Sequence, residues 1–554
     1  MGIVEVLLER KLVTPEQLAK AIELHKSQGT RVDRALVELG SLGEDALLAV
    51  LSEQLGMPLI DLSLVTIDVE ILRQMPPKLV YRKRLLPIAR NNGTLTVATS
   101  DPFDLYAFDE VRLLTGLEIQ PVLASSEEID KVIKAHYGLG GDTIDQMMST
   151  DDLEVVGEQG ENEDLEMAQE ASVIKLVNEI FLEAVSERAT DIHIEPYEND
   201  LDVRYRIDGV LHKASLPPQI RHFQAAIISR IKIMANLNIA EKRLPQDGRI
   251  KLQTGGKQID VRVSVIPMLF GEGIVMRLLD KSNVVITLPQ LGMDQDTFAI
   301  FKGLIARPHG IILVTGPTGS GKTTTLYAAL KAIVSPEIKV LTVEDPVEYH
   351  LDGLNQIQVQ SQIGMTFARG LRAILRHDPD VVMIGEIRDV ETAEAAIQAA
   401  LTGHLVFSTL HTNDACSSAT RLLDMGVEPF LVTSTVEAAM AQRLVRTICV
   451  ECKEAYAPDP EKLPADLKLE PGAMLYRGAG CRRCRGTGYR GRMGLFELMV
   501  TTDAVREKIM ARASAGDILT AARSSGLRLL REDGWVKVRQ GVTTPEEVIR
   551  CTKL

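Results

Sequence analysis

The chain has 554 residues, of which 45% are hydrophobic, 25% are charged and 4% are aromatic, as in an ordinary soluble α/β protein with several domains. The formal net charge of -14 argues against a surface built for nucleic acid, which normally needs a basic stripe. No stretch approaches the roughly 18 to 20 apolar residues of a membrane span, and Glu5 and Glu9 interrupt the N-terminus where a signal peptide needs an apolar run. We therefore expect a cytoplasmic protein.

The N-terminal third contains an internal duplication. Leu7-Leu8-Glu9 matches Leu36-Val37-Glu38 at an offset of 29 residues, and each copy predicts a short helix, a turn and a longer amphipathic helix. Strand-like segments follow at residues 85–89 and 94–98. We predict a docking domain over residues 1–140, made of a helical repeat and an α/β module, with an inert folding cap as the alternative.

Residues 141–170 contain no lysine or arginine, whereas aspartate and glutamate recur along them. Such a segment cannot bury enough apolar surface to order itself. We predict a flexible acidic linker here.

An α+β middle domain is predicted over residues 171–285. Ser172 is expected to cap a helix with one apolar face, and Asp208-Gly209 predicts a hairpin turn between two strands. Strand alternation places Arg204 and Arg206 on one face. Further arginines follow at Arg230, Arg243, Arg249, Arg262 and Arg277. We interpret Arg204, Arg206 and Arg249 as cations for the γ-phosphate of a nucleotide held by the next domain, with a solvated sheet face as the alternative.

A glycine-rich loop joins the apolar run at residues 311–314 to a helix-like stretch. The candidate nucleotide-binding residues of this loop and of the following helix are Gly316, Pro317, Thr318, Gly319, Ser320, Gly321, Lys322, Thr323 and Thr324. In such a strand-loop-helix unit, backbone N–H groups face a polyphosphate, Lys322 reaches the β- and γ-phosphates, and the Thr323 hydroxyl holds Mg²⁺. The pattern predicts an ATP site.

Three more apolar strands are predicted at residues 339–343, 381–385 and 405–409. Each ends in polar residues, as strands do at the carboxyl edge of an α/β sheet. Glu386 follows the second strand and is predicted to orient the attacking water, while Glu344 follows the first and is predicted to act through the metal's water shell. His404 and His411 flank the third strand and are candidates for sensing the γ-phosphate. Helix capping by the acids and structural roles for the histidines are the alternatives.

Two pairs of cysteines have the spacing of a four-thiolate zinc module. Cys449-x-x-Cys452 and Cys481-x-x-Cys484 are separated by 28 residues. Four thiolates leave no open position for water, so the zinc would be structural. We predict a zinc-binding insertion over residues 445–490 within an ATPase domain of residues 286–554, and we expect Cys416 and Cys551 to be free thiols.

Taken together, these motifs resemble the secretion ATPases, and more narrowly those of type II secretion and type IV pilus assembly. The resemblance is carried by the phosphate loop, residues 343–349, 384–389, 402–404 and 408–414, and the four cysteines. In that family these segments are the Walker A motif, the Asp box, the Walker B motif and the His box. Residues 276–280 and 420–430 are more similar to the type II secretion branch.

This resemblance implies an α/β multidomain fold with a PAS-like middle domain and a RecA-like P-loop ATPase domain. It implies a hexamer on the cytoplasmic face of the inner membrane, which hydrolyses ATP to turn a platform protein and assemble a pseudopilus. The N-terminal domain would dock onto the cytoplasmic part of a bitopic assembly protein. Some relatives bind cyclic di-GMP through Arg-Leu-Gly repeats, but this chain has Arg31-Val32-Asp33, so we do not expect that activity.

Other functions remain as alternatives. A pilus extension ATPase belongs to the same class. A scaffold that binds nucleotide without hydrolysing it is disfavoured, because it has no need for a water-orienting acid such as Glu386. A nucleic-acid translocase is disfavoured by the acidic charge balance.

Overall fold

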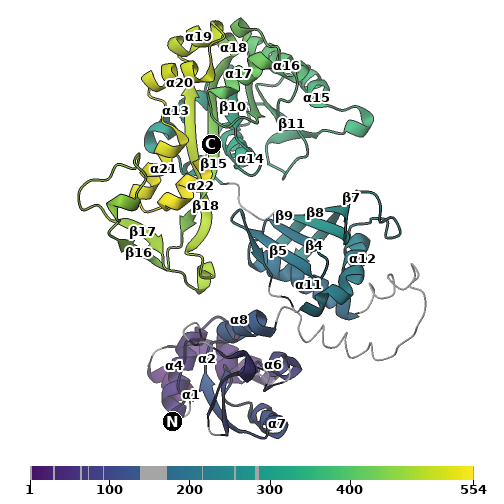
Figure 1. Ribbon diagram of the computed structural model, residues 1–554, viewed down its shortest axis with the longest axis vertical. Coiled ribbons are helices and arrows are strands. Elements are labelled where there is room, and N and C mark those ends of the chain that lie inside the picture. Colours follow the sequence, from purple (N-terminus) through teal and green to yellow (C-terminus); the bar gives the residue numbers. More distant parts are fainter. Residues whose placement is uncertain are drawn as a thin grey trace. The chain divides into compact units, whose positions relative to one another are not determined.

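The computed structural model describes residues 3–10, 12–28, 31–62, 65, 67–72, 74–75, 77–91, 93–137, 171–214, 216, 218–254, 257–280 and 286–552. The chain divides into two units, Met1–Leu279 and Asp280–Leu554 (Figure 1). Within the described ranges, no helix combines the length and the apolar character needed to cross a membrane. The acidic linker predicted at residues 141–170 lies outside these ranges.

Two pairs of helices open the chain, and each pair consists of a shorter and a longer helix. They are α1 (Ile3–Glu9), α2 (Pro15–Gln28), α3 (Val32–Glu38) and α4 (Glu44–Leu55). Leu7, Leu36 and Leu51 are almost inaccessible and lie in one apolar core shared by the pairs. The predicted helical repeat is therefore confirmed.

An α/β module follows the helical pairs. Its elements are α5 (Val69–Leu72), α6 (Pro77–Lys83), β1 (Leu86–Asn91), β2 (Thr94–Thr99), α7 (Leu105–Thr115), β3 (Glu118–Leu123) and α8 (Ser126–Tyr137). The strand order is β1-β2-β3, with β2 antiparallel to β1 and parallel to β3. The Asp104 carboxylate caps α7 by accepting from the backbone N–H of Ala107, at 3.1 Å.

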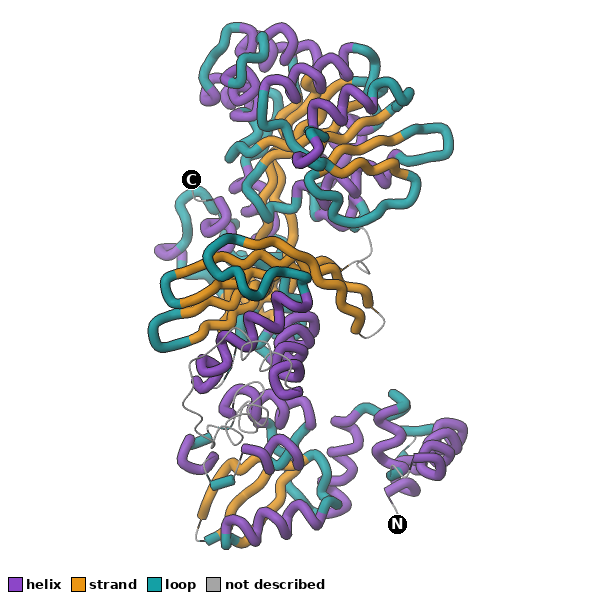
Figure 2. Tube along the Cα trace, turned by 90° about the vertical axis from the view of Figure 1, so that its right-hand side faces the viewer, coloured by secondary structure: helices purple, strands orange, loops and turns teal. Residues whose placement is uncertain are grey.

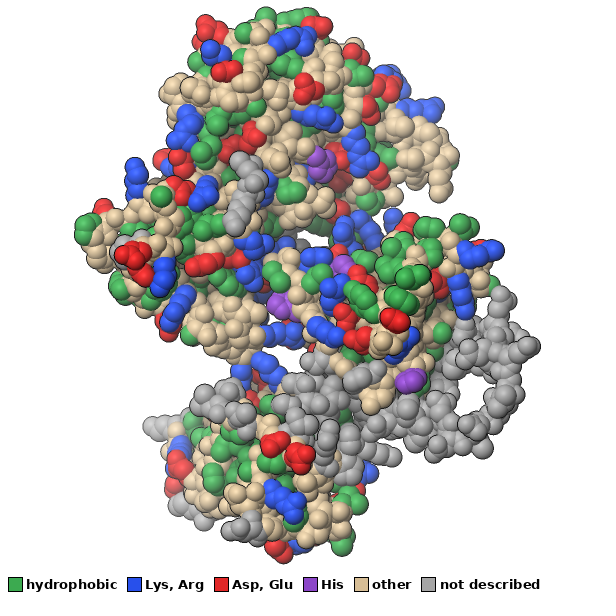
Figure 3. Space-filling view, in the orientation of Figure 1, with side chains coloured by type: hydrophobic (Ala, Val, Ile, Leu, Met, Phe, Trp, Pro, Cys, Tyr) green, Lys and Arg blue, Asp and Glu red, His purple; other side chains and the backbone are tan. Residues whose placement is uncertain are grey.

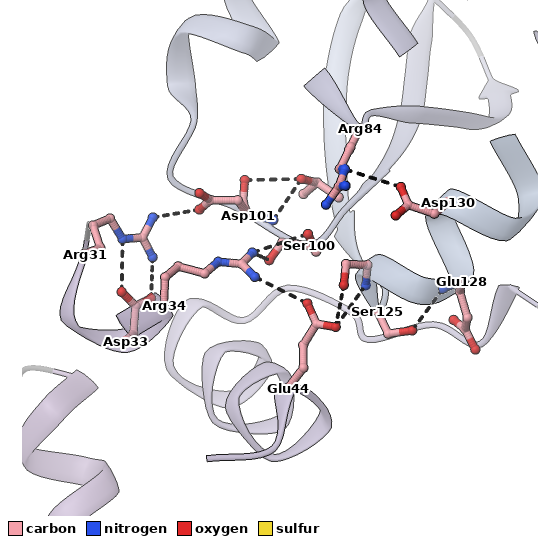
Figure 4. A network of polar contacts seen from close by, with 12 residues as sticks. Arg31, Asp33, Arg34, Glu44, Arg84, Ser100, Asp101, Ser125, Glu128 and Asp130 are labelled. Atoms are coloured by element: carbon pink, nitrogen blue, oxygen red, sulfur yellow. Dashed lines mark hydrogen bonds and ion pairs between the residues drawn. The ribbon is translucent and has the colours of Figure 1, made fainter. Parts of the chain in front are cut away.

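Polar side chains join the helical pairs to this module (Figure 4). Arg31 bonds to Asp33 and donates to Asp101 at 2.7 Å, and Glu44 accepts from the Ser126 hydroxyl at 2.7 Å. Asp33 is the third residue of the Arg31-Val32-Asp33 segment, and its carboxylate engages Arg31 itself. The Arg31 guanidinium is thus held by acids of its own chain.

The middle domain is a six-stranded antiparallel sheet with two helices on one face. Its elements are α11 (Ala171–Ser186), β4 (Asp191–Pro196), β5 (Leu201–Ile207), β6 (Val210–Lys213), η2 (Pro218–Phe223), α12 (Gln224–Met234), β7 (Gln246–Thr254), β8 (Lys257–Met268) and β9 (Gly271–Asp280). The strand order is β6-β5-β4-β9-β8-β7. Apolar residues of α11, α12 and the strands form one core. The Asp208-Gly209 hairpin is confirmed, with both residues in the left-handed region.

One detail of this domain was predicted wrongly. Helix α11 begins at Ala171, so Ser172 lies inside the first turn and is not the residue that precedes the helix. A cap must adopt a non-helical backbone, and Ser172 does not meet this requirement.

The second unit is built on a seven-stranded sheet. Its elements from η3 to β14 are η3 (Leu288–Leu291), α13 (Gln295–Ile305), β10 (Gly310–Thr315), α14 (Lys322–Ile333), β11 (Val340–Glu344), β12 (Leu354–Gln358), η4 (Ser361–Ile363), α15 (Phe367–Ile374), β13 (Val381–Ile384), α16 (Val390–Leu401) and β14 (Leu405–Leu410). The strand order is β12-β11-β13-β14-β10-β15-β18. Neighbouring strands from β12 to β15 are parallel, so their carboxyl ends share one edge.

The remaining elements complete this sheet and surround it. They are α17 (Ser417–Asp424), α18 (Pro429–Thr435), β15 (Val436–Ile448), β16 (Lys453–Tyr456), η5 (Pro460–Lys462), β17 (Leu475–Gly478), η6 (Arg482–Cys484), β18 (Tyr489–Val500), α19 (Asp503–Met510), α20 (Ala515–Ser524), α21 (Leu530–Arg539) and α22 (Pro545–Thr552). Strand β18 runs antiparallel to β15. The short hairpin β16-β17 lies in the cysteine-containing insertion between these two long strands.

Helices cover both faces of the seven-stranded sheet (Figure 2). In β10, Ile311 and Leu313 contribute to the core on one face, and Ile312 and Val314 to the core on the other. A strand that is buried on both faces has a continuous run of apolar residues in its sequence, and β10 has this pattern. Over α16 to α20, Figure 3 shows acidic, basic and apolar side chains interspersed on the surface.

A buried carboxylate fastens the last helix to β15. Glu547 on α22 is 2% exposed, and it accepts from Arg446 at 2.6 Å and from Arg550 at 2.8 Å. Burial acts to raise the pKa of Glu547, but the guanidinium groups of Arg550 and Arg446 dominate and lower it from 4.5 to about 2. This carboxylate stabilises the fold while it is charged.

We predict that Glu547→Gln lowers the free energy of unfolding of the full chain by about 1–3 kcal/mol at neutral pH, because charged hydrogen bonds are lost. Since the folded pKa lies below the ordinary value, the difference from wild type is constant above about pH 4.5 and shrinks as the pH falls toward about 2. Urea unfolding across this pH range measures it. Glu546→Gln, at the exposed neighbouring position, is the control and should be neutral. A difference that grows on acidification would contradict the assignment.

Candidate functional site

The phosphate loop connects β10 to α14 and lies against β15. Gly316, Gly319 and Gly321 have φ angles of 146°, 79° and 88°, in the region that favours glycine. A Cβ atom at Gly316 would lie 2.6 Å from the Gln442 carbonyl oxygen, and one at Gly321 would lie 2.8 Å from Gln442 Nε2. The loop backbone can approach β15 this closely only because these positions are glycine.

The polar groups of the loop suit a polyphosphate. Lys322 Nζ donates to the carbonyl oxygens of Gly316 at 2.8 Å and Pro317 at 3.1 Å. Burial lowers the pKa of Lys322, the nearby Glu386 carboxylate opposes this shift, and Arg443 adds to it. The Ser320 hydroxyl is buried and has no hydrogen-bond partner within the described part of the chain. A half-buried cation and an orphaned donor beside a glycine cradle fit the phosphate groups of a nucleotide.

Glu386 and His411 meet at the carboxyl edge of the sheet. Glu386 comes two residues after β13, its side chain is 12% exposed, and its Oε2 lies 3.1 Å from Nε2 of His411, directly after β14. The other carboxylate oxygen accepts from Arg388, and this hydrogen bond raises the pKa of Arg388. The structure therefore brings together the predicted water-orienting acid and one of the two predicted histidines.

Glu344 lies at the end of β11 on the same edge, but its carboxylate is engaged. It is 3% exposed, and its Oε1 accepts from Thr342 at 2.5 Å and from Gln356 at 3.2 Å. The Tyr327 hydroxyl on α14 donates to the other oxygen. Burial raises the pKa of Tyr327, so this phenol stays a donor. Glu344 thus joins β11, β12 and α14, and its role near the metal stays a prediction.

His404 is not brought to this site within the chain. It precedes β14, and its Nδ1 lies 2.8 Å from the carbonyl oxygen of Ala399 and 3.0 Å from the Thr402 hydroxyl at the end of α16. The six residues of β14 separate it from His411 by roughly 20 Å. Within the chain, only the residue after the strand reaches the carboxyl edge. Sensing of the γ-phosphate by His404 therefore stays a prediction.

The middle-domain arginines form two sets. Arg204 is paired with Glu195, and Arg206 Nε lies 3.7 Å from Asp191, so acids of β4 face both side chains. In contrast, Arg249 lies directly opposite Arg262 in the β7-β8 register. Arg249 and Arg262 line a cavity of about 410 Å³ together with Arg277, which also donates to Asp191 at 3.1 Å.

The four predicted zinc ligands converge. Their Sγ atoms all lie within 4.8 Å of one another, and the contacts Cys449 to Cys481, Cys452 to Cys484 and Cys481 to Cys484 are each 3.7 Å. Four thiolates at ~2.3 Å from one zinc ion would be about 3.8 Å apart. The backbone N–H groups of Cys481 and Gly488 also donate to the Cys484 sulfur, at 3.1 and 3.3 Å. The geometry therefore fits a tetrahedral metal, and Cys416 and Cys551 remain free thiols.

Sequence reasoning missed three residues beside this edge, namely Gln442, Arg443 and Glu497 on β15 and β18. Gln442 accepts from the Thr325 hydroxyl of α14 at 2.8 Å, and Arg443 donates to the carbonyl oxygen of Asn413 at 2.9 Å. A sequence pattern could have found two of them, because Gln442 and Arg443 are polar residues that directly follow the apolar run at residues 438–441. Glu386 was chosen from the sequence because it follows an apolar strand in the same way. Only the parallel pairing of β15 with β10 shows that they adjoin the loop.

A parallel sheet covered on both faces, with a glycine loop, an acid and a histidine at its carboxyl edge, defines a P-loop ATPase with a RecA-like fold. The chain belongs to the family described as Type II/IV secretion system protein, whose model matches residues 166–550. A second model, described as MshEN domain, matches residues 55–143.

Similar proteins share most of this chain. The Type IV pilus assembly ATPase PilB of Myxococcus xanthus is 45% identical over 99% of this chain and 98% of that protein. The Type II secretion system protein E of Xanthomonas campestris is 46% identical over 100% of this chain and 98% of that protein. Among solved structures, the Yersinia pseudotuberculosis ATPase DotB is 22% identical over 68% of this chain and 93% of that chain, with a TM-score of 0.50, which indicates a shared fold.

Proposed function

We propose that this ATPase powers protein export by a type II secretion system. The proposal rests on the Glu386–His411 contact beside the phosphate loop, because a protein that only bound nucleotide would have no use for a poised acid there. Relatives named for type II secretion, such as protein E of Xanthomonas campestris, support the secretion branch. The working form is a hexamer at the cytoplasmic face of the inner membrane, where ATP hydrolysis drives pseudopilus assembly.

In this proposal each residue has a defined role. The loop amides and Lys322 bind the ATP phosphates, the Thr323 hydroxyl holds Mg²⁺, and Glu386 orients the attacking water. When bound, Mg²⁺ neutralises charge on the β- and γ-phosphates. His411 holds the Glu386 carboxylate in place, and Glu344 acts through the water shell of the metal.

The middle domain supplies further cations for the phosphates. Of the three arginines chosen from the sequence, Arg249 is the one that lines the cavity of the middle domain with Arg262 and Arg277. Arg204 and Arg206 would have to leave Glu195 and Asp191 to take part.

The partners are proteins of the inner membrane. A platform protein receives the motion, and the N-terminal domain binds the cytoplasmic part of a bitopic assembly protein. Nucleic acid is not expected as a partner, given the net charge of -14. A structural zinc ion is held by Cys449, Cys452, Cys481 and Cys484.

Type IV pilus extension is the second candidate function. It is favoured by the 45% identity to PilB of Myxococcus xanthus, which extends over 99% of this chain. Deletion of the gene in its own host separates the two functions: loss of exported enzymes with intact pili supports secretion, and loss of pili with intact export supports pilus extension.

The catalytic assignment is tested with Glu386→Gln. We expect this variant to bind Mg·ATP within about threefold of wild type and to hydrolyse it at least ~100-fold more slowly, because the amide cannot accept a proton from water. Equilibrium binding and phosphate release measure the two effects. Glu394→Gln, at an exposed position of α16, is the matched control and should retain wild-type turnover. Turnover by Glu386→Gln within about threefold of wild type would remove Glu386 from the mechanism.

The zinc assignment is tested with Cys452→Ser. We expect the metal content of the purified chain to fall from about one zinc per chain to nearly none, with a Tm at least ~4 °C lower, since a structural zinc contributes to folding. Elemental analysis and calorimetry provide the readouts. Cys551→Ser is the control, because the Cys551 thiol donates to the carbonyl oxygen of Leu444 and is not part of the four-cysteine cluster. A wild-type chain that contains no zinc, together with a Tm of Cys452→Ser equal to that of wild type, would contradict the assignment.

A further inference from the structure

The loop after β14, which carries His411, is fastened to neighbouring strands. At the end of β10, the Thr315 hydroxyl oxygen accepts from the Thr412 backbone N–H at 2.8 Å. On β18, the buried Glu497 carboxylate accepts from the backbone N–H of Ala415 at 2.9 Å. On β15, Arg443 donates to the carbonyl oxygen of Asn413 at 2.9 Å. His411 is therefore presented to Glu386 by a loop that β10, β15 and β18 hold.

Arg443 contacts the phosphate loop as well. Its Nη1 donates to the Gln442 carbonyl oxygen at 3.1 Å and lies 3.0 Å from the position that a Cβ atom of Gly316 would occupy. The same guanidinium thus lies against the first glycine of the phosphate loop and binds the loop that carries His411.

The groups around Arg443 favour a guanidinium at this position. Glu497 and Asp414 are the acids that face it, and Lys322 is close enough for Arg443 to lower its pKa. The side chain is half-buried, so each lost hydrogen bond would leave an acceptor poorly satisfied. A guanidinium donates in two fixed directions at once, whereas a lysine ammonium is a point charge on a flexible stem.

We propose that Arg443 is a positioning residue that couples the phosphate loop to the His411 loop. A shift of Gly316 on ATP binding moves Arg443, which moves Asn413 and with it His411 against Glu386. The proposal rests on the proposed roles of Glu386 and His411 in hydrolysis. It predicts that Arg443 affects turnover of bound ATP more than it affects nucleotide affinity.

The test compares Arg443→Gln and Arg443→Lys with wild type in the full chain. We expect Arg443→Gln to bind ADP within about threefold of wild type, to keep its Tm within about 3 °C, and to lose at least ~10-fold in kcat. Arg443→Lys should recover part of the lost kcat, because it restores the charge and one donor. Arg523→Gln is the control, because Arg523 forms an exposed ion pair with Glu532 on the C-terminal helices, and it should match wild type.

Two results would overturn the proposal: an unchanged kcat in Arg443→Gln, or an ADP affinity that falls as much as kcat. If Arg443→Gln does not fold, Glu497→Gln takes its place, since it weakens the hold on Ala415 while leaving the phosphate loop intact. It should lower kcat with little effect on ADP binding, and an unchanged kcat would also overturn the proposal. Glu386→Gln is measured in parallel to separate failure of the Arg443 proposal from failure of the proposed hydrolytic site. Turnover by Glu386→Gln would refute the hydrolytic site itself.

Discussion

The close approach of the phosphate loop to β15 is the constraint on which the rest of the site depends. Glycine at positions 316 and 321 lets the loop backbone lie against Gln442, and parallel pairing of β10 with β15 then places Arg443 beside the same loop. Because β13 and β14 run parallel to β10 in the same sheet, Glu386 and His411 emerge at the same edge. One arrangement of strands thus collects the phosphate cradle, the acid and the histidine.

The charged side chains at this edge are engaged by neighbouring groups. Glu386 is nearly buried, and its two carboxylate oxygens are engaged by Arg388 and by Nε2 of His411. Lys322 is partly desolvated and rests on two loop carbonyls, which a phosphate group would replace as acceptors. Glu344 and Tyr327 form a separate buried network that ties α14 to β11.

Much of this site could be predicted from local patterns. The phosphate loop, Glu386 and His411 all follow apolar strands, and parallel strands end at one edge, so the sequence order alone predicts their convergence. The cysteine spacing likewise predicted the convergence of the four thiols. The remaining features of the site depend on pairing between strands that are far apart in the sequence. His404 precedes its strand and lies at the opposite edge, the acids that neutralise Arg204 and Arg206 come from β4, and Arg443 adjoins the loop only through the non-local β10–β15 pairing.

In the proposed function, this sheet edge hydrolyses ATP when the chain is assembled into a hexamer. The most direct measurement is phosphate release from Mg·ATP by the full chain as its concentration is raised, with the size of the assembly followed on the same samples. We predict that turnover per chain rises as hexamers form, so that total activity increases faster than linearly with concentration. ATP binding without phosphate release at every concentration would contradict it and would identify a nucleotide-binding scaffold.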